Sequence, residues 1–148
     1  MTESETRAAI VAEAMTWLST PYHHHARIKG VGVDCAQLPN ACYSAVGLIP
    51  VLEPDYSPQW MLHHDEEAYL AWVTPYAREI TRADLLPGDM VMWRFGRTYS
   101  HSAIVIEAPT VIHATQRASA VILGDLDRDA DLISRPARYF SLFGKIAK

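Results

Sequence analysis

The pattern of the sequence changes near residue 85, and this change constrains the fold most strongly. Before residue 85, apolar residues recur at helical spacing, whereas after it short β-prone runs are separated by Pro, Gly or polar turns. The runs are LLPGDMVMW (85–93), HSAIVIE (101–107), TVIHA (110–114), SAVILG (119–124) and ARYFSLFG (137–144). Helices in the first half and consecutive strands in the second predict an α+β domain with a C-terminal antiparallel sheet.

The first expected helix spans residues 2–18. Its apolar positions fall on one stripe: Ile10, Ala14, Trp17 and Leu18. Thr2 and Glu5 have the spacing of a capping box, in which each side chain bonds to the other residue's backbone N–H. The stretch 19–33, STPYHHHARIKGVGV, is then expected to be a loop, because Pro21 and two glycines interrupt it.

A second helix is expected to begin at Asp34 and end at Gly47. Asp is a favourable N-cap residue, Gln37 gives the capping-box spacing, and Gly fits a helix stop. The buried stripe is expected to contain Leu38, Cys42, Ala45 and Val46. Pro39 lies beyond the first turn, so it should remove a hydrogen bond or bend the helix.

The remaining stretches add one short helix. Residues 50–64 contain three prolines and are expected to be irregular, and residues 65–73 form a helix that Thr74-Pro75 ends. We find no internal repeat, linker or low-complexity tract. Residues 1–148 are therefore expected to form a single domain, which is an ordinary size for one.

Composition and charge exclude several classes of protein. Hydrophobic residues make up 49% of the chain and charged residues 20%, which is typical of a folded domain and not of a disordered segment. The net charge of −4 provides no basic excess to neutralise phosphates, so a nucleic-acid partner is not expected.

The N-terminal residues do not resemble an export signal. The start, MTESETRAAIVAEAMTW, is acidic, and Glu13 interrupts its apolar stretch. No run is long enough to cross a bilayer. We therefore expect a soluble product made in the cytoplasm, which would need a route other than a Sec signal to act in the periplasm.

Cys35 is the first candidate for chemistry. At the start of the expected helix, with Asp34 as cap, it would lie at the positive end of the helix dipole, which favours the reactive thiolate. The alternative is a small buried apolar side chain. Cys42 lies two helical turns further on, about 10.5 Å of rise, so the two cysteines cannot form a disulfide within one helix.

His101 and His113 could provide the base that a thiol nucleophile needs. His101 shares a face of its expected strand with Ala103 and Val105, and His113 lies on the next strand. Because the connection between these strands is short, they should pair as a hairpin and bring the two rings within hydrogen-bonding reach. Two unrelated histidines remain the alternative.

Other clusters are weaker candidates for sites. Three consecutive side chains at 23–25, HHH, would point in different directions on an extended loop, and His63-His64 has the same difficulty, so no metal is expected. The GVG at 30–32 lacks the preceding strand and the third glycine of a dinucleotide site. We therefore expect no cofactor.

Taken in order, several blocks resemble the NlpC/P60 family of papain-like cysteine peptidases. TPYHHHARIKGVGVDCAQL resembles the family's segment around the nucleophile, and LLPGDMVMWRF is similar to its block before the base strand. HSAIVIE and VIHA resemble the strands that carry the two histidines. The first block, which follows a start without an export leader, is most similar to the cell-wall peptidases encoded by phages and gene-transfer agents.

The resemblance implies a role for each matching residue. Cys35 would be the nucleophile, His101 its base, and His113 the residue that orients His101. Tyr22 would lie near the nucleophile and help to hold the oxyanion or substrate, together with the backbone at the helix start. Asp34, the helix cap beside the nucleophile, matches the family pattern and is expected at the substrate groove. The chain departs from the pattern after the cysteine, where Ala36 and Gln37 replace Ser and Gly, and after the histidine, where Ser102 and Ala103 replace Val and Gly. Gln37 could face the groove.

The resemblance implies cleavage of peptidoglycan stem peptides, most often between a D-γ-glutamyl residue and a diamino acid. A phage tail or assembly component with the same fold and a mainly structural role is an alternative. A thiol acyltransferase or amidase is another, and it would exclude water from its acyl-enzyme. Tail or tail-like particle proteins are the protein partners that the resemblance implies.

Overall fold

The computed structural model of the protein describes residues 1–50 and 68–144. The expected irregular segment and the first residues of the expected third helix lie outside these ranges, as does His63-His64. The helix itself is present as α4 (Ala68–Val73). Within the described residues, no helix is both long and apolar enough to span a membrane.

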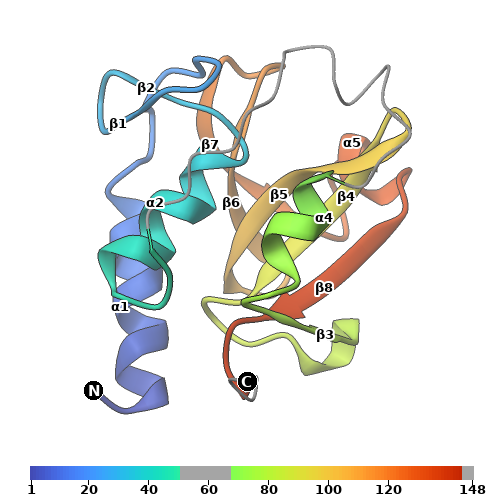
Figure 1. Ribbon diagram of the computed structural model, residues 1–148. Coiled ribbons are helices and arrows are strands. Elements are labelled where there is room, and N and C mark those ends of the chain that lie inside the picture. The colour runs from blue at the N-terminus through green and yellow to red at the C-terminus, as the bar shows by residue number, and fades with distance from the viewer. Residues whose placement is uncertain (51–67, 145–148) are drawn as a thin grey trace.

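The first half of the chain forms the two expected longer helices, both shorter than expected: α1 ends before Trp17 and Leu18, and α2 begins three residues after Asp34. Helix α1 (Glu3–Met15) begins with the predicted capping box: Glu5 N–H donates to Thr2 Oγ1 at 3.1 Å, and Thr2 N–H donates to Glu5 Oε1 at 3.0 Å. Helix α2 (Gln37–Ala45) lies beside α1 (Figure 1), and Gly47 follows it with a φ of +79°. The expected buried stripe is wrong at Ala45, which is exposed.

The loop expected at 19–33 contains a small hairpin that the sequence pattern does not indicate. Strands β1 (Arg27–Ile28) and β2 (Gly32–Val33) pair antiparallel, and Gly30 occupies the turn between them with a φ of +78°. Tyr22 forms an isolated bridge to Val33. This hairpin holds the chain just before Cys35, so it fixes the approach to α2.

The second half forms the expected antiparallel sheet, with one additional strand. Its order is β3-β8-β4-β5-β6-β7. The strands are β3 (Arg78–Ile80), β4 (Met90–Phe95), β5 (Thr98–Glu107), β6 (Thr110–Thr115), β7 (Ala120–Asp125) and β8 (Ala137–Ser141). A 3-10 turn, η1 (Arg82–Asp84), precedes β4, and a short helix, α5 (Ala130–Ile133), precedes β8.

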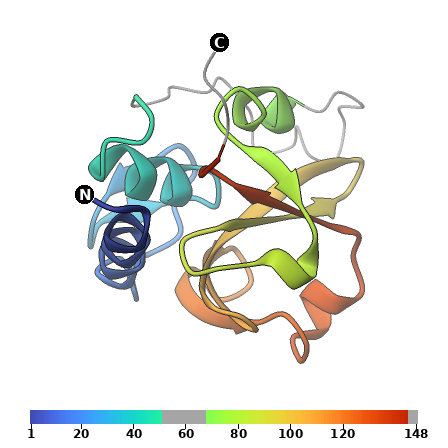
Figure 2. The same ribbon diagram turned by 90° about the horizontal axis from the view of Figure 1, so that it is seen from below.

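Both faces of this sheet are covered, because successive side chains of a strand point to opposite sides. On one face, Met92 and Ile104 pack with buried residues of α1, α2 and α4. On the other, Trp93 and Val105 pack with Leu132 of α5 in a smaller core. Figures 1 and 2 show α1 and α2 together on one side of the sheet and α5 away from them.

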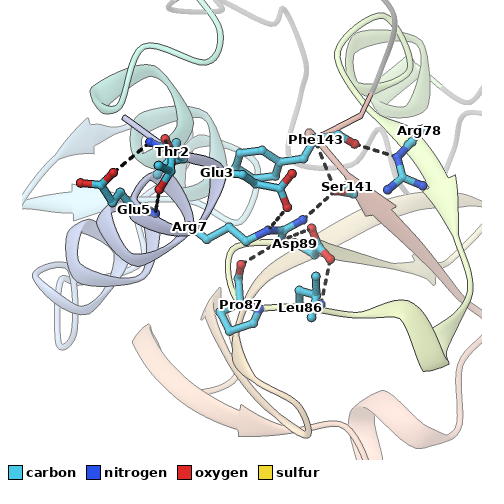
Figure 3. Close-up of polar contacts among 11 residues, drawn as sticks. Thr2, Glu3, Glu5, Arg7, Arg78, Leu86, Pro87, Asp89, Ser141 and Phe143 are labelled. Atoms are coloured by element: carbon cyan, nitrogen blue, oxygen red, sulfur yellow. Dashed lines mark hydrogen bonds and ion pairs between the residues drawn. The ribbon is translucent and has the colours of Figure 1, made fainter.

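A buried ion pair joins α1 to the sheet (Figure 3). Arg7 Nη1 donates to Asp89 Oδ1 at 2.8 Å and to the Pro87 carbonyl at 2.9 Å. Arg7 Nη2 donates to Ser141 Oγ in β8 at 3.3 Å, and Asp89 Oδ2 accepts the Leu86 N–H. The N-terminal helix is thereby tied to the turn before β4 and to the last strand.

Candidate active site

Asp34 organises the chain between the β1-β2 hairpin and α2. Its Oδ1 accepts the backbone N–H groups of Ala36 and Gln37 at 3.2 and 2.9 Å, and its Oδ2 accepts that of His25 at 2.8 Å. The Leu38 N–H donates to the Asp34 carbonyl at 3.1 Å. Asp34 therefore caps this turn as expected, although α2 itself begins at Gln37 and Cys35 lies in the turn before it.

The structure places Ala36 and Gln37 away from the expected groove. The Gln37 side chain is buried, and its Oε1 accepts hydrogen bonds from Arg27 Nη1 at 3.0 Å and Asn40 Nδ2 at 3.1 Å. These partners replace the capping-box bond that the spacing suggests. Ala36 lines a different, mostly apolar pocket between α2 and α4. Neither side chain contributes to the cavity that contains Cys35.

Cys35 is held against β5 on both sides of His101. Its Sγ donates to the Ser100 carbonyl at 3.4 Å, and its own carbonyl accepts the Ser102 hydroxyl at 2.8 Å. In a regular helix, the N–H four residues later would donate to this carbonyl. That residue is Pro39, which has no N–H, so the carbonyl is available to Ser102.

His101 and His113 are brought together by the hairpin that the sequence predicts. Strands β5 and β6 pair antiparallel with Ile104 opposite Ile112. His101 Nε2 and His113 Nδ1 are 2.7 Å apart, and both side chains are only 5% exposed. The Phe95 ring stacks on the His101 ring at a centroid distance of 4.7 Å, which limits rotation of that ring.

The three candidate residues line one cavity of about 290 Å³. Its walls also include Tyr22, Phe95, Arg117, Asp131 and Arg135. The Tyr22 hydroxyl hydrogen-bonds to the Cys35 thiol, as the resemblance led us to expect of a tyrosine near the nucleophile. A thiol, an imidazole pair and a hydroxyl therefore line one accessible space, while the thiol itself donates to the Ser100 carbonyl and not to His101.

The environment of Cys35 opposes the thiolate that the helix-start position was expected to favour. Burial and, to a smaller extent, the Asp34 carboxylate raise the pKa of the Cys35 thiol to about 12. The Tyr22 hydrogen bond and the backbone N–H groups of Cys35 and Ala36 lower the pKa, as the helix-start argument requires, but burial and Asp34 outweigh them. Cys35 therefore rests as a thiol that donates its hydrogen to Ser100.

The histidine pair rests uncharged as well. Burial lowers the pKa of His101 well below its usual value, and the neighbouring His113 and Arg135 lower it further. Burial lowers the pKa of His113 to about 4, against the opposing effect of Asp129 and Asp131. Burial thus shifts all three groups toward their uncharged forms, the Cys35 thiol and the two neutral imidazoles.

The other histidine-rich tract does not gather into a ligand set. His24 Nδ1 lies 3.8 Å from Asp34 Oδ2, and the His24 and His25 rings stack at 4.1 Å. Within residues 1–50 and 68–144, no group of three or more His, Cys, Asp or Glu side chains converges as metal ligands would. Cys35 and Cys42 are both free.

Sequence reasoning missed residues that reach the site from distant strands and turns. The Arg135 guanidinium lies 3.8 Å above the Phe95 ring, and Tyr69 of α4 hydrogen-bonds to Ser102 at 2.8 Å. No local pattern marks either residue, because only the packing of α4 and of the segment between α5 and β8 against the sheet brings them near. Pro39 was a usable signal, since a proline four residues after Cys35 indicates a carbonyl that lacks its helical donor.

Comparison with known proteins places this geometry in a family. A sequence model of the NlpC/P60 family matches residues 19–130. The NlpC/p60 domain of the peptidoglycan hydrolase SagA superposes with a TM-score of 0.65 at 22% identity, over 89% of this chain and 96% of that one. The peptidoglycan hydrolase RipB from Mycobacterium tuberculosis gives a TM-score of 0.68 at 16% identity, over 98% and 70%.

A longer relative and the curated sequences complete the comparison. NlpC1 from Trichomonas vaginalis gives a TM-score of 0.69 at 15% identity, over 95% of this chain. This chain spans only 44% of the Trichomonas chain. The comparison with curated protein sequences finds no match. At these identities the solved structures bear on the fold, and they confirm the expected α+β arrangement of N-terminal helices on a C-terminal antiparallel sheet.

Proposed function

The chain belongs to the NlpC/P60 family, and from this premise we propose that it is a cysteine peptidase that hydrolyses peptidoglycan stem peptides. The observation that carries the proposal is the 2.7 Å contact between His101 and His113 in the cavity that also contains Cys35. Two of the structural relatives, SagA and RipB, are peptidoglycan hydrolases, which supports the same polymer as substrate.

In the proposed mechanism, Cys35 loses its proton only as it attacks. His101 Nε2 is engaged by His113, so the other ring nitrogen, Nδ1, takes the thiol proton while Sγ bonds to the peptide carbonyl carbon. Because both groups rest uncharged, this transfer creates the charge pair during the reaction. His101 then gives the proton to the leaving amine, and water hydrolyses the thioester by the reverse sequence.

The oxyanion of the tetrahedral intermediate would be stabilised by the Cys35 N–H and the Tyr22 hydroxyl. The N–H groups of Ala36 and Gln37 already donate to Asp34 Oδ1, so they are committed to the turn. Because Tyr22 contacts the Cys35 thiol, its hydroxyl would lie beside the carbon that Cys35 attacks. Donors fixed before the reaction stabilise developing charge without reorganisation.

For the bond cleaved, we propose the link between the D-γ-glutamyl residue and the diamino acid, as the family resemblance implies. Stem peptides carry free carboxylates near this bond. The cavity offers Arg117 and Arg135 as cationic partners, and Arg117 is itself paired with Asp131 at 2.6 Å. These short-range contacts would bind an anionic peptide even though the whole chain has a net charge of −4.

The test is digestion of purified muropeptides followed by mass spectrometry. We expect two products whose masses sum to the substrate plus one water, split at the γ-glutamyl bond. Cys35→Ala should abolish cleavage, and the matched variant Cys42→Ala should retain it, because Cys42 is fully enclosed in the helix-side core. A lack of cleavage by the wild-type protein would contradict the proposal.

The same assay separates the alternative activities. A thiol acyltransferase would yield a product that carries an added amine in place of water when an amine acceptor is supplied. A mainly structural role would give no turnover and no dependence on Cys35. For delivery, we propose a tail-like particle, on the basis of the resemblance of the TPYHHHARIKG block; mass spectrometry of purified particles should then detect the chain.

A further inference from the structure

The Nε2 nitrogen of His113 is buried and raises the question of its hydrogen-bond partner. If His101 Nδ1 is to accept a proton from Cys35, the His101 hydrogen lies on Nε2 and is donated to His113 Nδ1. His113 must then carry its own hydrogen on Nε2. This nitrogen is buried and has no hydrogen-bond partner among the described residues. A buried N–H without an acceptor destabilises the protein. The tautomer that the reaction needs therefore requires an acceptor for the His113 Nε2–H.

Gly124 lies between His113 and the carboxylate of Asp129, which is the candidate acceptor. It is opposite Val111 in the β6-β7 pairing, on the same face as His113. A Cβ on Gly124 would lie 2.8 Å from His113 Nε2 and 3.0 Å from Asp129 Oδ2. The imidazole nitrogen and the carboxylate oxygen therefore face the same point beside Gly124, and any larger residue there would push one of them away.

Asp129 is held in this position by the backbone. Its Oδ2 accepts the Asp125 N–H at 2.9 Å at the end of β7. A second cavity, of about 370 Å³, is lined by both His113 and Asp129. The Asp129 carboxylate is also the largest of the charge effects that raise the pKa of His113.

We propose that Asp129 is a positioning residue that extends the site to Cys35–His101–His113–Asp129, accepting the His113 Nε2–H directly or through one water. This inference rests on the proposed function. The proton moves only from Cys35 Sγ to His101 Nδ1. The resulting positive charge on His101 polarises His113 through their hydrogen bond, and Asp129 remains a carboxylate that stabilises this charge.

Charged groups around the pair act in both directions. Asp129 and Asp131 raise the pKa of His113, and Arg135 lowers that of His101. Asp131 is paired with Arg117 at 2.6 Å, whereas Asp129 shares the point beside Gly124 with the ring nitrogen. Of the two carboxylates, Asp129 is thus the one placed to accept the hydrogen.

The test variant is Asp129→Asn, which removes the charge but retains an oxygen for the Asp125 N–H. We expect kcat/KM to fall by about tenfold or more, the effect of losing one hydrogen bond to a charged group. The acid limb of the pH–rate profile should also move to lower pH, because the protonated pair loses its counter-charge. Asp129→Glu should restore part of the rate. Asp127→Asn, an exposed carboxylate of the same turn paired with Arg82, should change neither quantity.

A second measurement does not depend on turnover. In a Cys35→Ala background, titration of the two histidines followed by 15N NMR should show protonation at lower pH after Asp129→Asn. An unchanged histidine titration would overturn the proposed role of Asp129, whatever the activity. If the titration shifts while the wild-type protein cleaves no muropeptide, the role of Asp129 beside His113 stands and the proposed function is wrong.

Discussion

At the scale of single residues, the site is defined by groups that burial keeps neutral. The Cys35 thiol donates to the Ser100 carbonyl, and its pKa is raised to about 12. His101 and His113 both have lowered pKa values because they are enclosed. Charge separation inside the cavity therefore has to be driven by the bound substrate and by fixed donors, and chemical reactivity without substrate should be low.

The first expected outcome concerns alkylation of Cys35 by iodoacetamide. Because the thiolate is the reactive form, its labelling rate should rise about tenfold per pH unit from neutral pH upward and show no plateau near pH 6. Cys42, which is completely enclosed, should label more slowly at every pH. Peptide mapping by mass spectrometry measures both rates. A plateau at low pH would show a resting ion pair and contradict the raised pKa.

The second expected outcome concerns Arg135, whose charge lowers the pKa of His101. His101 must be neutral to accept a proton, so activity falls as the pH drops through its pKa. Arg135→Gln removes the opposing charge and raises that pKa. The acid limb of kcat/KM should move to higher pH, opposite in sign to Asp129→Asn. Arg82→Gln, an exposed arginine paired with Asp127, should leave the profile unchanged.

At the scale of elements, a proline in α2 links helix geometry to the site. Without an N–H at Pro39, the Cys35 carbonyl accepts the Ser102 hydroxyl instead. The Ser102 oxygen in turn contacts the Tyr69 hydroxyl at 2.8 Å, so α4, β5 and the turn before α2 meet at one hydroxyl group. The bond fixes Cys35 relative to the strand that carries His101.

Ser102→Ala tests this link. It leaves the Cys35 carbonyl and the Tyr69 hydroxyl without their partner, so unfolding free energy should fall by about 1–3 kcal/mol. Adding Pro39→Ala supplies a helical N–H for the Cys35 carbonyl and should restore part of the stability. Activity should not recover with it, because the tie to β5 remains absent. Urea denaturation and the muropeptide assay measure the two effects, and parallel recovery of both would contradict a positioning role.

The elements that the sequence predicted are those with strong local signals. The capping box of α1 needs only Thr2 and Glu5, and the alternation in β4, β5 and β6 follows from strand geometry. Strand β3 has no such signal, because its three residues are mostly exposed and form a strand only through pairing with β8. The two-residue strands β1 and β2 were missed for the same reason.

The site divides in the same way. The contact between His101 and His113 followed from two strands joined by a short turn, which spacing alone indicates. The raised pKa of Cys35 could not be predicted, because burial depends on packing against β5. Asp129 and Gly124 come together only when β7 and the following turn close over His113, so no local pattern marked them.

At the scale of the whole molecule, the site forms where two halves of the chain meet. Cys35 belongs to the helical half, and His101 and His113 belong to the sheet (Figure 1). The halves share the larger core, and the Arg7–Asp89 ion pair ties α1 to the sheet beside it. The position of Cys35 relative to the two histidines therefore depends on the junction between the halves as well as on the cavity itself.

Arg7→Met tests how much this junction contributes to stability. The Arg7 and Asp89 side chains are 9% and 1% exposed, so the variant leaves a buried carboxylate without its counter-charge (Figure 3). Unfolding free energy should fall by about 3–5 kcal/mol in urea denaturation.

The control variant Arg82→Met breaks an exposed pair of similar length, with side chains 41% and 58% exposed, and should cost at most about 1 kcal/mol. In the double variant Arg7→Met/Asp89→Asn the unpaired charge is gone, so the loss should be smaller than the sum of the two single losses. Equal effects of Arg7→Met and Arg82→Met would show that the buried pair does not hold the two halves together.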